Sequence, residues 1–318
     1  MKRYCLIITL LMLLVSCKPK QEEFQIASFT VHQDAFWDII PRDAVAERIG
    51  IRFDFTEGPA WHPGGLLLFS DIPANKIYSW DGRGYEVFLD SSGNSNGLLA
   101  LRDGSLLVCE HGGRCLSLHS PSGQRNVLVD SYKGRRLNSP NDLCRGSDGA
   151  LYFTDPPWGL PKRNNDPQKE LAFNGVFRLS RGQLQLLDST LSWPNGIALS
   201  PDECFLYVAN FEGDRERPET WEVFWVRYEL DSQGKVLGKE RFFQAEDLSL
   251  PGGPDGMKVD RRGNLFVTGP GGILVINPQG EHLGTINLPD PCSNLAFNSR
   301  QTTLFVTARS TVVRIRLK

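Results

Sequence analysis

The sequence has few of the features that mark several large classes of protein. Lys and Arg (35 residues) nearly balance Asp and Glu (37), the formal charge is −2, and no basic run is longer than a pair. Binding to nucleic acid phosphates requires a concentrated basic face, so nucleic acid is excluded as a partner. Seven cysteines occur, and none has CxxC spacing with another. Neither a disulfide framework nor a structural zinc site is therefore indicated.

Long apolar runs are also scarce, and the one that opens the chain is a targeting segment. Lys2 and Arg3 precede the apolar stretch 5–15, which is too short to span a bilayer. The stretch ends in Leu-Val-Ser followed by Cys17, which resembles a bacterial lipobox. We therefore expect a lipoprotein signal peptide (1–16), a lipidated Cys17 followed by a tether (17–43), and a protein exported to the cell envelope and attached to a membrane by lipid alone. An ordinary signal peptide with a chance cysteine is the alternative.

Five cysteines remain after Cys17, an odd number. Cys109, Cys144 and Cys204 stand in or beside apolar runs, which predicts small buried core residues rather than reactive thiols. A single disulfide stays open as an alternative, because exported proteins meet an oxidising environment.

The remaining chain, 44–318, is organised as a repeat. Six segments align, and each runs through a turn into a β-rich stretch: LLLFSD, SLLVCE, ALYFTD, FLYVAN, NLFVTG and TLFVTA. Their first residues are Glu57, Asn96, Asn141, Asn195, Asp255 and Asn294, a spacing of roughly 40 to 60 residues, which is the size of a propeller blade. Asp-Gly pairs at 103–104 and 148–149 are strong hairpin signals. The sequence therefore predicts an all-β fold, a six-bladed β-propeller.

The last repeat supplies only about three strands. A strand from Ala44–Phe55 is expected to complete that blade, which closes the ring and removes open sheet edges. The first strand of each blade lines the central channel. The six residues that open these strands should therefore meet at one mouth of the channel, and all six carry a side-chain oxygen.

Carboxylates and amides that converge on one axis are suitable ligands for a hard cation such as Ca²⁺. No His or Cys occupies a ring position, which argues against soft metals. Asn96 and Asn294 are equally compatible with simple strand-entry turns. Glu57 is not, because a Glu at an apolar channel mouth needs a partner for its charge.

Six stretches carry a further resemblance: TEGPAW (Thr56–Trp61), CEHGGR (Cys109–Arg114), RLNSPNDL (Arg136–Leu143), YFTDPPWG (Tyr152–Gly159), WPNGIALSPD (Trp193–Asp202) and PGGPDGMKVD (Pro251–Asp260). The chain resembles the family of senescence marker protein, gluconolactonase and luciferin-regenerating enzyme, especially its bacterial gluconolactonase-like branch. The resemblance implies one divalent cation at the channel mouth, with Ca²⁺ expected and Mg²⁺, Mn²⁺ or Zn²⁺ as alternatives. It assigns Glu57, Asn141, Asn195 and Asp255 as ligands, and it implies hydrolysis of a lactone.

The resemblance also places Asp255 at the position of the catalytic general base. A carboxylate beside the cation can accept a proton from the attacking water, and a hydroxide held by the cation is an equally open source of the nucleophile. His111, Arg136 and Asn96 are candidate substrate-binding residues. His111 is as compatible with a histidine that fills the channel and bonds to backbone. Asp155 is a candidate for orienting the ligands.

Trp158 and Trp221 lie in the long loops of blades three and four, where they either stack on a sugar ring or pin their loops.

In the animal branch of the family, an Arg that holds the substrate stands where this chain has Ser139. This departure leaves gluconolactone as the particular substrate open, although it leaves the predicted cation site intact.

The expected function is cation-dependent hydrolysis of a small-molecule lactone, such as the sugar lactone gluconolactone, in the cell envelope. A phosphotriester or aryl ester hydrolase on the same site is one alternative, because a fold does not determine its substrate. A non-catalytic propeller that binds sugar or protein is the other, and the paired carboxylates of Glu57 and Asp255 argue against it. The sequence does not indicate an oligomeric state.

Overall fold

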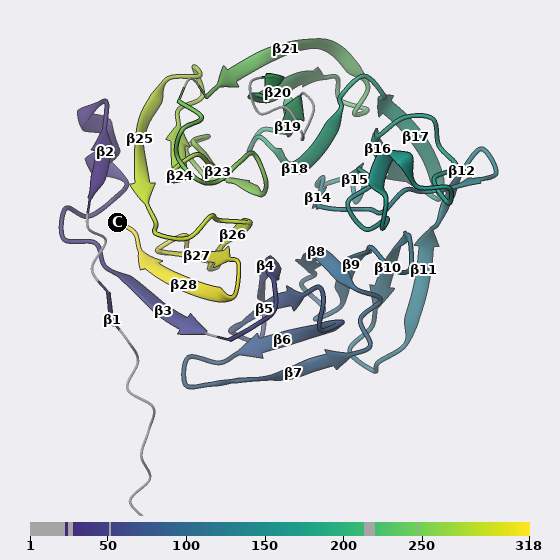
Figure 1. Cartoon of the computed structure of the whole chain (residues 1–318), viewed down its shortest axis with the longest axis horizontal. Coiled ribbons are helices and arrows are strands. Elements are labelled where there is room, and N and C mark those ends of the chain that lie inside the picture. The colour runs from purple at the N-terminus through teal and green to yellow at the C-terminus, as the bar shows by residue number, and fades with distance from the viewer. Residues whose placement is uncertain (1–22, 25–27, 51, 213–219, 246) are drawn as a thin grey trace, which may run out of the picture.

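The computed structural model describes residues 23–24, 28–50, 52–212, 220–245 and 247–318. Six antiparallel sheets stand around a central axis like the blades of a propeller (Figure 1). The predicted six-bladed, all-β propeller is confirmed. Cys17 and most of the long loop of blade four lie outside the described residues. Within the described ranges, no helix has the length and apolar character needed to cross a membrane.

Each blade runs from an innermost strand at the axis to an outer strand at the rim. Blade 1 contains β4 (Thr56–His62), β5 (Leu66–Asp71), β6 (Lys76–Trp80) and β7 (Tyr85–Asp90). Blade 2 contains β8 (Ser95–Ala100), β9 (Leu106–Glu110), β10 (Cys115–His119) and β11 (Arg125–Val129). Blade 3 contains β14 (Leu143–Arg145), β15 (Leu151–Asp155), β16 (Gly175–Ser180) and β17 (Gln183–Asp188). Blade 4 contains β18 (Trp193–Leu199), β19 (Phe205–Glu212), β20 (Glu222–Leu230) and β21 (Val236–Gln244).

The last two blades have an additional outer strand each. Blade 5 contains β22 (Met257–Val259), β23 (Leu265–Gly269), β24 (Gly272–Ile276) and β25 (His282–Asn287), with β2 (Phe29–Val31) outside them. Blade 6 contains β26 (Asn294–Phe297), β27 (Thr303–Ala308), β28 (Thr311–Arg316) and β3 (Ala46–Gly50), with β1 (Glu23–Phe24) outside them. A small hairpin, β12 (Ser131–Tyr132) and β13 (Arg135–Arg136), lies between blades 2 and 3. Among the elements given for the described residues are also two 3₁₀ turns, η1 (Asp34–Asp38) and η2 (Arg163–Asn165).

The N-terminal part of the chain closes the ring, as predicted. Strand β3 pairs antiparallel with β28, so the first and last parts of the chain share blade 6 (Figure 1). The pairing joins residues that are far apart in the sequence, such as Arg314 and Glu47, which also form an ion pair. Closure therefore covers what would be an open sheet edge at the end of the last repeat.

Residues 28–43 differ from the sequence-based expectation, which groups them with the tether. Strand β2 pairs with the outer strand of blade 5, and the following η1 turn buries Phe36 completely. Ile40 is also fully buried, in the same cluster as Ile286 and Val313. Burial of apolar side chains at these positions is more favourable than their exposure to water in a tether. The packed fold therefore begins before residue 44.

The hydrophobic core lies between neighbouring blades. Leu68 and Ile77 of blade 1 pack with Leu98 and Val108 of blade 2, and the same arrangement recurs around the ring. Alternate residues of each strand point toward one neighbouring blade or the other, which is why the second strands read as continuous apolar runs. Burial of each such aliphatic side chain stabilises the fold by about 1.5–3 kcal/mol.

The five cysteines among the described residues are free, and one of them is not where the sequence pattern predicts it. Cys109, Cys115, Cys144, Cys204 and Cys292 form no disulfide. Cys109 is buried as expected, but Cys204 is exposed. Cys204 follows the turn after Asp202, so it precedes the buried part of β19 instead of belonging to it.

Bulges and glycines bring the inner strands close to the axis. The ladders of blades 1, 2 and 4 shift register at Glu57/Ala60, Ser95/Leu98 and Pro194/Ile197. A bulge of this kind re-aims a side chain away from the regular pleat. A Cβ on Gly58, whose φ is +51°, would lie 1.9 Å from the Asn96 carbonyl oxygen, and one on Gly196 would lie 2.1 Å from that of Asp255. Only glycine allows neighbouring inner strands to approach this closely.

Candidate functional site

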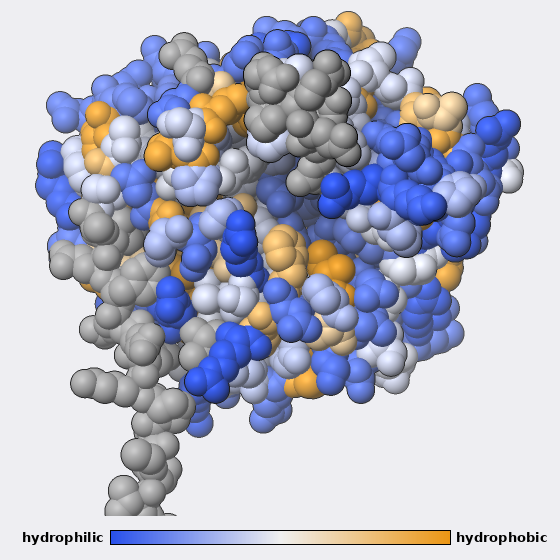
Figure 2. All heavy atoms as spheres, viewed as in Figure 1, coloured by the Kyte–Doolittle hydropathy of each residue, from blue (hydrophilic) through white to orange (hydrophobic). Residues whose placement is uncertain are grey.

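The six predicted ring residues come from the innermost strand, or the residue or two before it, of each blade. Glu57, Asn96, Asn195 and Asn294 lie on β4, β8, β18 and β26, whereas Asn141 and Asp255 stand two residues before the first residue of β14 and β22. Five of the six are buried, and Asp255 is partly exposed. The face of the propeller viewed in Figure 2 is hollowed near its middle, where mostly hydrophilic residues are visible.

Glu57 and Asp255 form the acidic centre of the ring. The two carboxyl groups lie close enough for the charge of Glu57 to act on Asp255, and the nearby Asn195 amide favours the ionised form of Asp255. Burial raises the pKa of Glu57 to about 7. Burial, followed by the negative charge of Glu57, raises the pKa of Asp255 well above its usual range. Two carboxylates held this closely repel each other, and a cation between them removes that repulsion.

Amide oxygens without a protein partner accompany this pair. The Oδ1 atoms of Asn96 and Asn195 are buried and accept no hydrogen bond from the described residues. The Asn195 amide nitrogen is held in place, because it donates to the Pro254 carbonyl at 3.2 Å. A buried acceptor without a donor costs about 1–3 kcal/mol, and coordination of a cation removes that cost.

The donor set therefore fits a hard divalent cation. Within the described ranges, no three His, Cys, Asp or Glu side chains are arranged to hold a metal by themselves. A cation here would depend on two carboxylates and on amide oxygens, which is a set that suits Ca²⁺ or Mg²⁺ rather than a soft metal. The residues that could hold it are Glu57, Asn141, Asn195 and Asp255.

Two charged residues next to the ring escaped the sequence analysis. Asp142 is 2% exposed, and its Oδ2 lies 3.9 Å from the Lys258 Nζ. The signal was present in the repeat: the residue after the ring position is Gly in four blades but Asp142 in blade 3. Lys258 belongs to the stretch PGGPDGMKVD, but no local pattern shows that a residue on β22 meets one beside β14.

His111 and Asn96 form a pair at the ring. His111 is 6% exposed, and its Nε2 lies 3.0 Å from the Asn96 Nδ2, which donates to it. Burial lowers the pKa of His111 to about 4, so the imidazole is neutral near pH 7. The His111 side chain therefore contacts a ring residue, Asn96. The sequence had been equally compatible with a histidine that fills the channel and bonds only to backbone.

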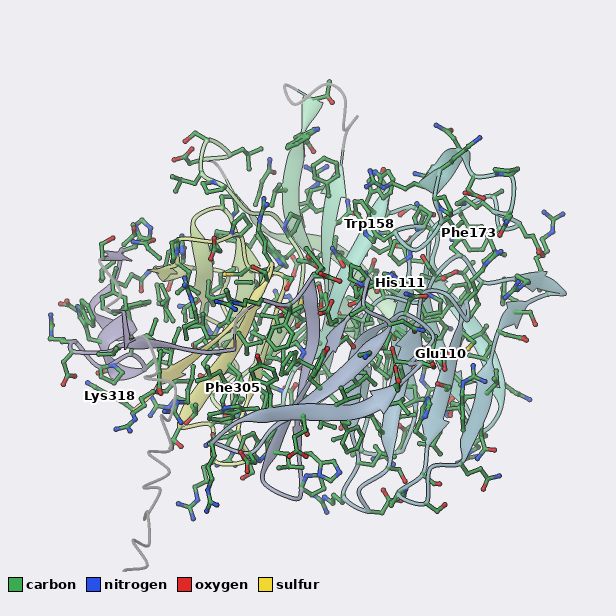
Figure 3. All side chains as sticks on the ribbon, turned by 60° about the horizontal axis from the view of Figure 1, so that its bottom comes forward. Glu110, His111, Trp158, Phe173, Phe305 and Lys318 are labelled. Carbon is green, nitrogen blue, oxygen red and sulfur yellow. The ribbon has the colours of Figure 1, made fainter. Side chains whose placement is uncertain are left out.

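The loop after β15 covers this pair. Figure 3 shows Trp158 and His111 at the same end of the molecule. A Cβ on Gly159 would lie 2.7 Å from the Cβ of His111, so the loop backbone packs directly against the histidine. Trp158 packs on Trp193 with ring centroids 4.5 Å apart, two residues before Asn195.

Ser139 and Asp155 fasten this loop to the segment that carries Asn141. Asp155 is fully buried and accepts hydrogen bonds from the backbone N–H groups of Asn138 and Ser139, each at 2.8 Å. Ser139 Oγ donates to the Pro156 carbonyl at 2.6 Å and accepts from the Gly159 N–H at 2.9 Å. Burial raises the pKa of Asp155 to about 7. Ser139 therefore serves as a fully buried loop anchor, and its position has no room for an Arg.

Arg136 lies apart from the ring. Its side chain is exposed and donates to the Gly113 carbonyl at 3.1 Å, and its backbone N–H donates to Glu170 at 2.7 Å. It contacts no ring residue among the described hydrogen bonds. Trp221 packs edge-on against Phe211 at 5.0 Å, at the end of β19.

Comparison with known proteins gives consistent results. Residues 55–310 match the model of the SMP-30/gluconolactonase/LRE-like region. The chain is 43% identical to a gluconolactonase of Zymomonas mobilis over 318 aligned residues, which cover 92% of this chain and 86% of that protein. The structure is similar to that of a gluconolactonase from Xanthomonas campestris, with a TM-score of 0.84, 32% identity and coverage of 95% of this chain and 99% of the other. A calcium-binding protein, regucalcin, from Agrobacterium tumefaciens shares the fold, with a TM-score of 0.67, 19% identity and coverage of 85% and 95%.

Proposed function

The chain belongs to the SMP-30/gluconolactonase/LRE-like family, and we propose that it is a divalent-cation-dependent lactonase that acts on a sugar lactone such as gluconolactone in the cell envelope. The 43% identity to a gluconolactonase over nearly the whole chain supports lactone hydrolysis. The observation that carries the cation dependence is the electrostatic repulsion between two carboxyl groups, the buried Glu57 and the partly exposed Asp255, beside amide oxygens that lack a donor.

Glu57, Asn141, Asn195 and Asp255 are proposed to hold the cation. When bound, the cation supplies electrophilic polarisation of the lactone carbonyl and compensates the negative charge that develops on its oxygen. Asp255 is more exposed than Glu57, so it is the carboxylate that water and substrate can reach from the mouth of the channel. We assign it the removal of a proton from the attacking water. Glu57, at 2% exposed, is assigned to ligation only.

Asn96 and His111 are proposed to bind substrate. The neutral imidazole accepts a hydrogen bond from the Asn96 Nδ2. The Asn96 Oδ1 then remains an unused acceptor, which suits a sugar hydroxyl as donor. Arg136 lies further out, and a contact between it and substrate requires a substrate that extends past the Gly113 loop.

Ca²⁺ is the proposed ion, because the donor set contains oxygens alone and the calcium-binding regucalcin shares the fold. To test the proposal, acid release from gluconolactone and other sugar lactones is measured before and after chelation with EDTA. We expect hydrolysis to fall to the uncatalysed rate after chelation and to return with Ca²⁺. Equal activity with EDTA contradicts the cation dependence, and activity confined to aryl esters or phosphotriesters contradicts the lactonase assignment.

Trp158 is expected to contribute to substrate binding and not to the cation site. Its loop packs on His111, but it supplies none of the proposed ligands. Stacking contacts of aromatic rings are worth about 1 kcal/mol. If the contact with a sugar ring has a similar energy, Trp158→Ala should raise KM by roughly fivefold while kcat and bound Ca²⁺ per chain stay unchanged. Steady-state kinetics and metal analysis measure these values. Trp37→Ala, on the outer edge of blade 5, is the matched control and should leave KM unchanged. Loss of Ca²⁺ in folded Trp158→Ala would contradict this division of roles.

The cell-envelope location is proposed from the lipobox that ends at Cys17. Expressed in bacteria, the full chain should incorporate radiolabelled palmitate and fractionate with membranes. Cys17→Ala should abolish the label and release soluble protein, whereas Cys204→Ala, which removes an exposed thiol, should change neither. Label that persists in Cys17→Ala would end the assignment.

A further inference from the structure

Next to the proposed cation ligands lies an ion pair that the lactonase proposal does not use. Asp142 precedes β14 in blade 3 and is 2% exposed, and Lys258 lies on β22 in blade 5 with 26% of its side chain exposed. The Lys258 Nζ lies 3.9 Å from the Asp142 Oδ2 and donates to the Met257 carbonyl at 2.9 Å. Because these blades are not neighbours in the ring, the two side chains meet across the channel.

Asn294 connects this pair to the acidic centre. Its Nδ2 donates to the Glu57 Oε2 at 3.1 Å and approaches the Asp142 Oδ2 at 3.5 Å. Its Oδ1 accepts from the Leu295 N–H at 2.8 Å, which fixes the orientation of the amide. A continuous line of contacts therefore runs from Lys258 through Asp142 and Asn294 to Glu57.

The charges in this line have a simple sum. Three carboxylates (Glu57, Asp142 and Asp255) and one ammonium (Lys258) leave a net charge of −2 when all four groups are ionised. The fields of Asp142 and Lys258 both reach Glu57, where the first raises and the second lowers its pKa, after the larger effect of burial. A divalent cation brings the sum to zero, which a buried site favours strongly over any residual charge.

We propose that Lys258 is an electrostatic positioning residue, which offsets the charge of Asp142 across the channel and thereby adapts the site to divalent rather than trivalent cations. The proposal rests on the cation site described under the proposed function. Asp142 keeps Asn294 oriented toward Glu57, and Lys258 prevents its carboxylate from adding a third negative charge to the site. Removal of the ammonium should strengthen cation binding, and more so for a more highly charged ion.

The test compares the dissociation constants of Ca²⁺ and Tb³⁺ for the apoprotein, measured by titration calorimetry with a competing chelator. Coulomb energy scales with the product of the charges. If Lys258→Met tightens Ca²⁺ binding by about tenfold, Tb³⁺ binding should tighten by about thirtyfold, so that the ratio of the two constants changes by about threefold. Lys258→Arg restores the positive charge and should return the ratio toward that of the wild type.

Asp142 supplies the opposite arm. Asp142→Asn keeps an acceptor oxygen for Asn294 but removes one negative charge, so both ions should bind more weakly, and Tb³⁺ more so. The double variant Asp142→Asn/Lys258→Met has the net charge of the wild type and should recover a similar ratio. If Lys258→Met does not fold, Lys258→Gln removes the same positive charge and is measured in its place.

Three outcomes contradict the proposal in distinguishable ways. Equal changes for both ions in folded variants would show that Lys258 acts through packing alone. Weaker Ca²⁺ binding in Lys258→Met would give its charge the wrong sign. Failure of the wild type to bind either ion would instead overturn the proposed cation site on which the inference rests.

Discussion

Asp255→Asn should lower kcat for lactone hydrolysis by about 10²–10⁴-fold, even with saturating Ca²⁺. The amide of Asn can still ligate through its oxygen, but it cannot accept the proton of the attacking water at neutral pH. Asp255 is the partly exposed carboxylate of the pair, and the charge of Glu57 acts on it. The substitution therefore separates proton removal from ligation. The measurement is kcat at a series of Ca²⁺ concentrations that reaches saturation by calorimetry.

Asp247→Asn is the matched control. Asp247 lies in the same connection between blades 4 and 5, and its carboxylate accepts hydrogen bonds only from Ser249 among the described residues. Its kcat should equal that of the wild type. Recovery of near wild-type turnover by Asp255→Asn at high Ca²⁺ would mean that Asp255 is a ligand only and that another group removes the proton.

Glu57→Gln should weaken Ca²⁺ binding by on the order of 100-fold, because affinity at oxygen sites depends on the charge of the ligands. Gln is nearly isosteric, and its oxygen can still accept from Gly58 and Asn294, which bond the Glu57 Oε2 in the native chain. Since Glu57 is assigned no proton transfer, excess Ca²⁺ should restore most of the activity. Calorimetry gives the affinity, and kinetics at saturating Ca²⁺ give the recovery.

Glu86→Gln, on the exposed outer strand of the same blade, should change neither value. If Glu57→Gln binds Ca²⁺ normally, Glu57 is not a ligand. If it binds Ca²⁺ but stays inactive, Glu57 takes part in the reaction itself. The opposite responses of Glu57→Gln and Asp255→Asn to added Ca²⁺ would together assign ligation to one carboxylate and proton removal to the other.

The fold and the ring could be predicted because their signals are local and repeated. Each repeat contains an apolar second strand preceded by a turn, and a residue with a side-chain oxygen opens its first strand. Glu57, Asn141 and Asp255 are such residues, and the six of them recur at blade-sized intervals. The closure of blade 6 by β3 followed from counting strands. The roles of the ring residues in ligation and catalysis rest on the family resemblance and await the experiments above.

Other features depend on contacts between distant parts of the chain, which no local pattern records. Asn294 and Glu57 are separated by 237 positions, yet their side chains are 3.1 Å apart. Only the closed ring brings Lys258 to Asp142, seats residues 28–43 on blade 5, and makes Ser139 a buried anchor for the loop over His111. The sequence alone thus determined the blades and the side-chain oxygens at their first strands, because both repeat from blade to blade. The tertiary structure decided which charged groups surround the site and which loop covers it, because both depend on contacts between different blades at the axis.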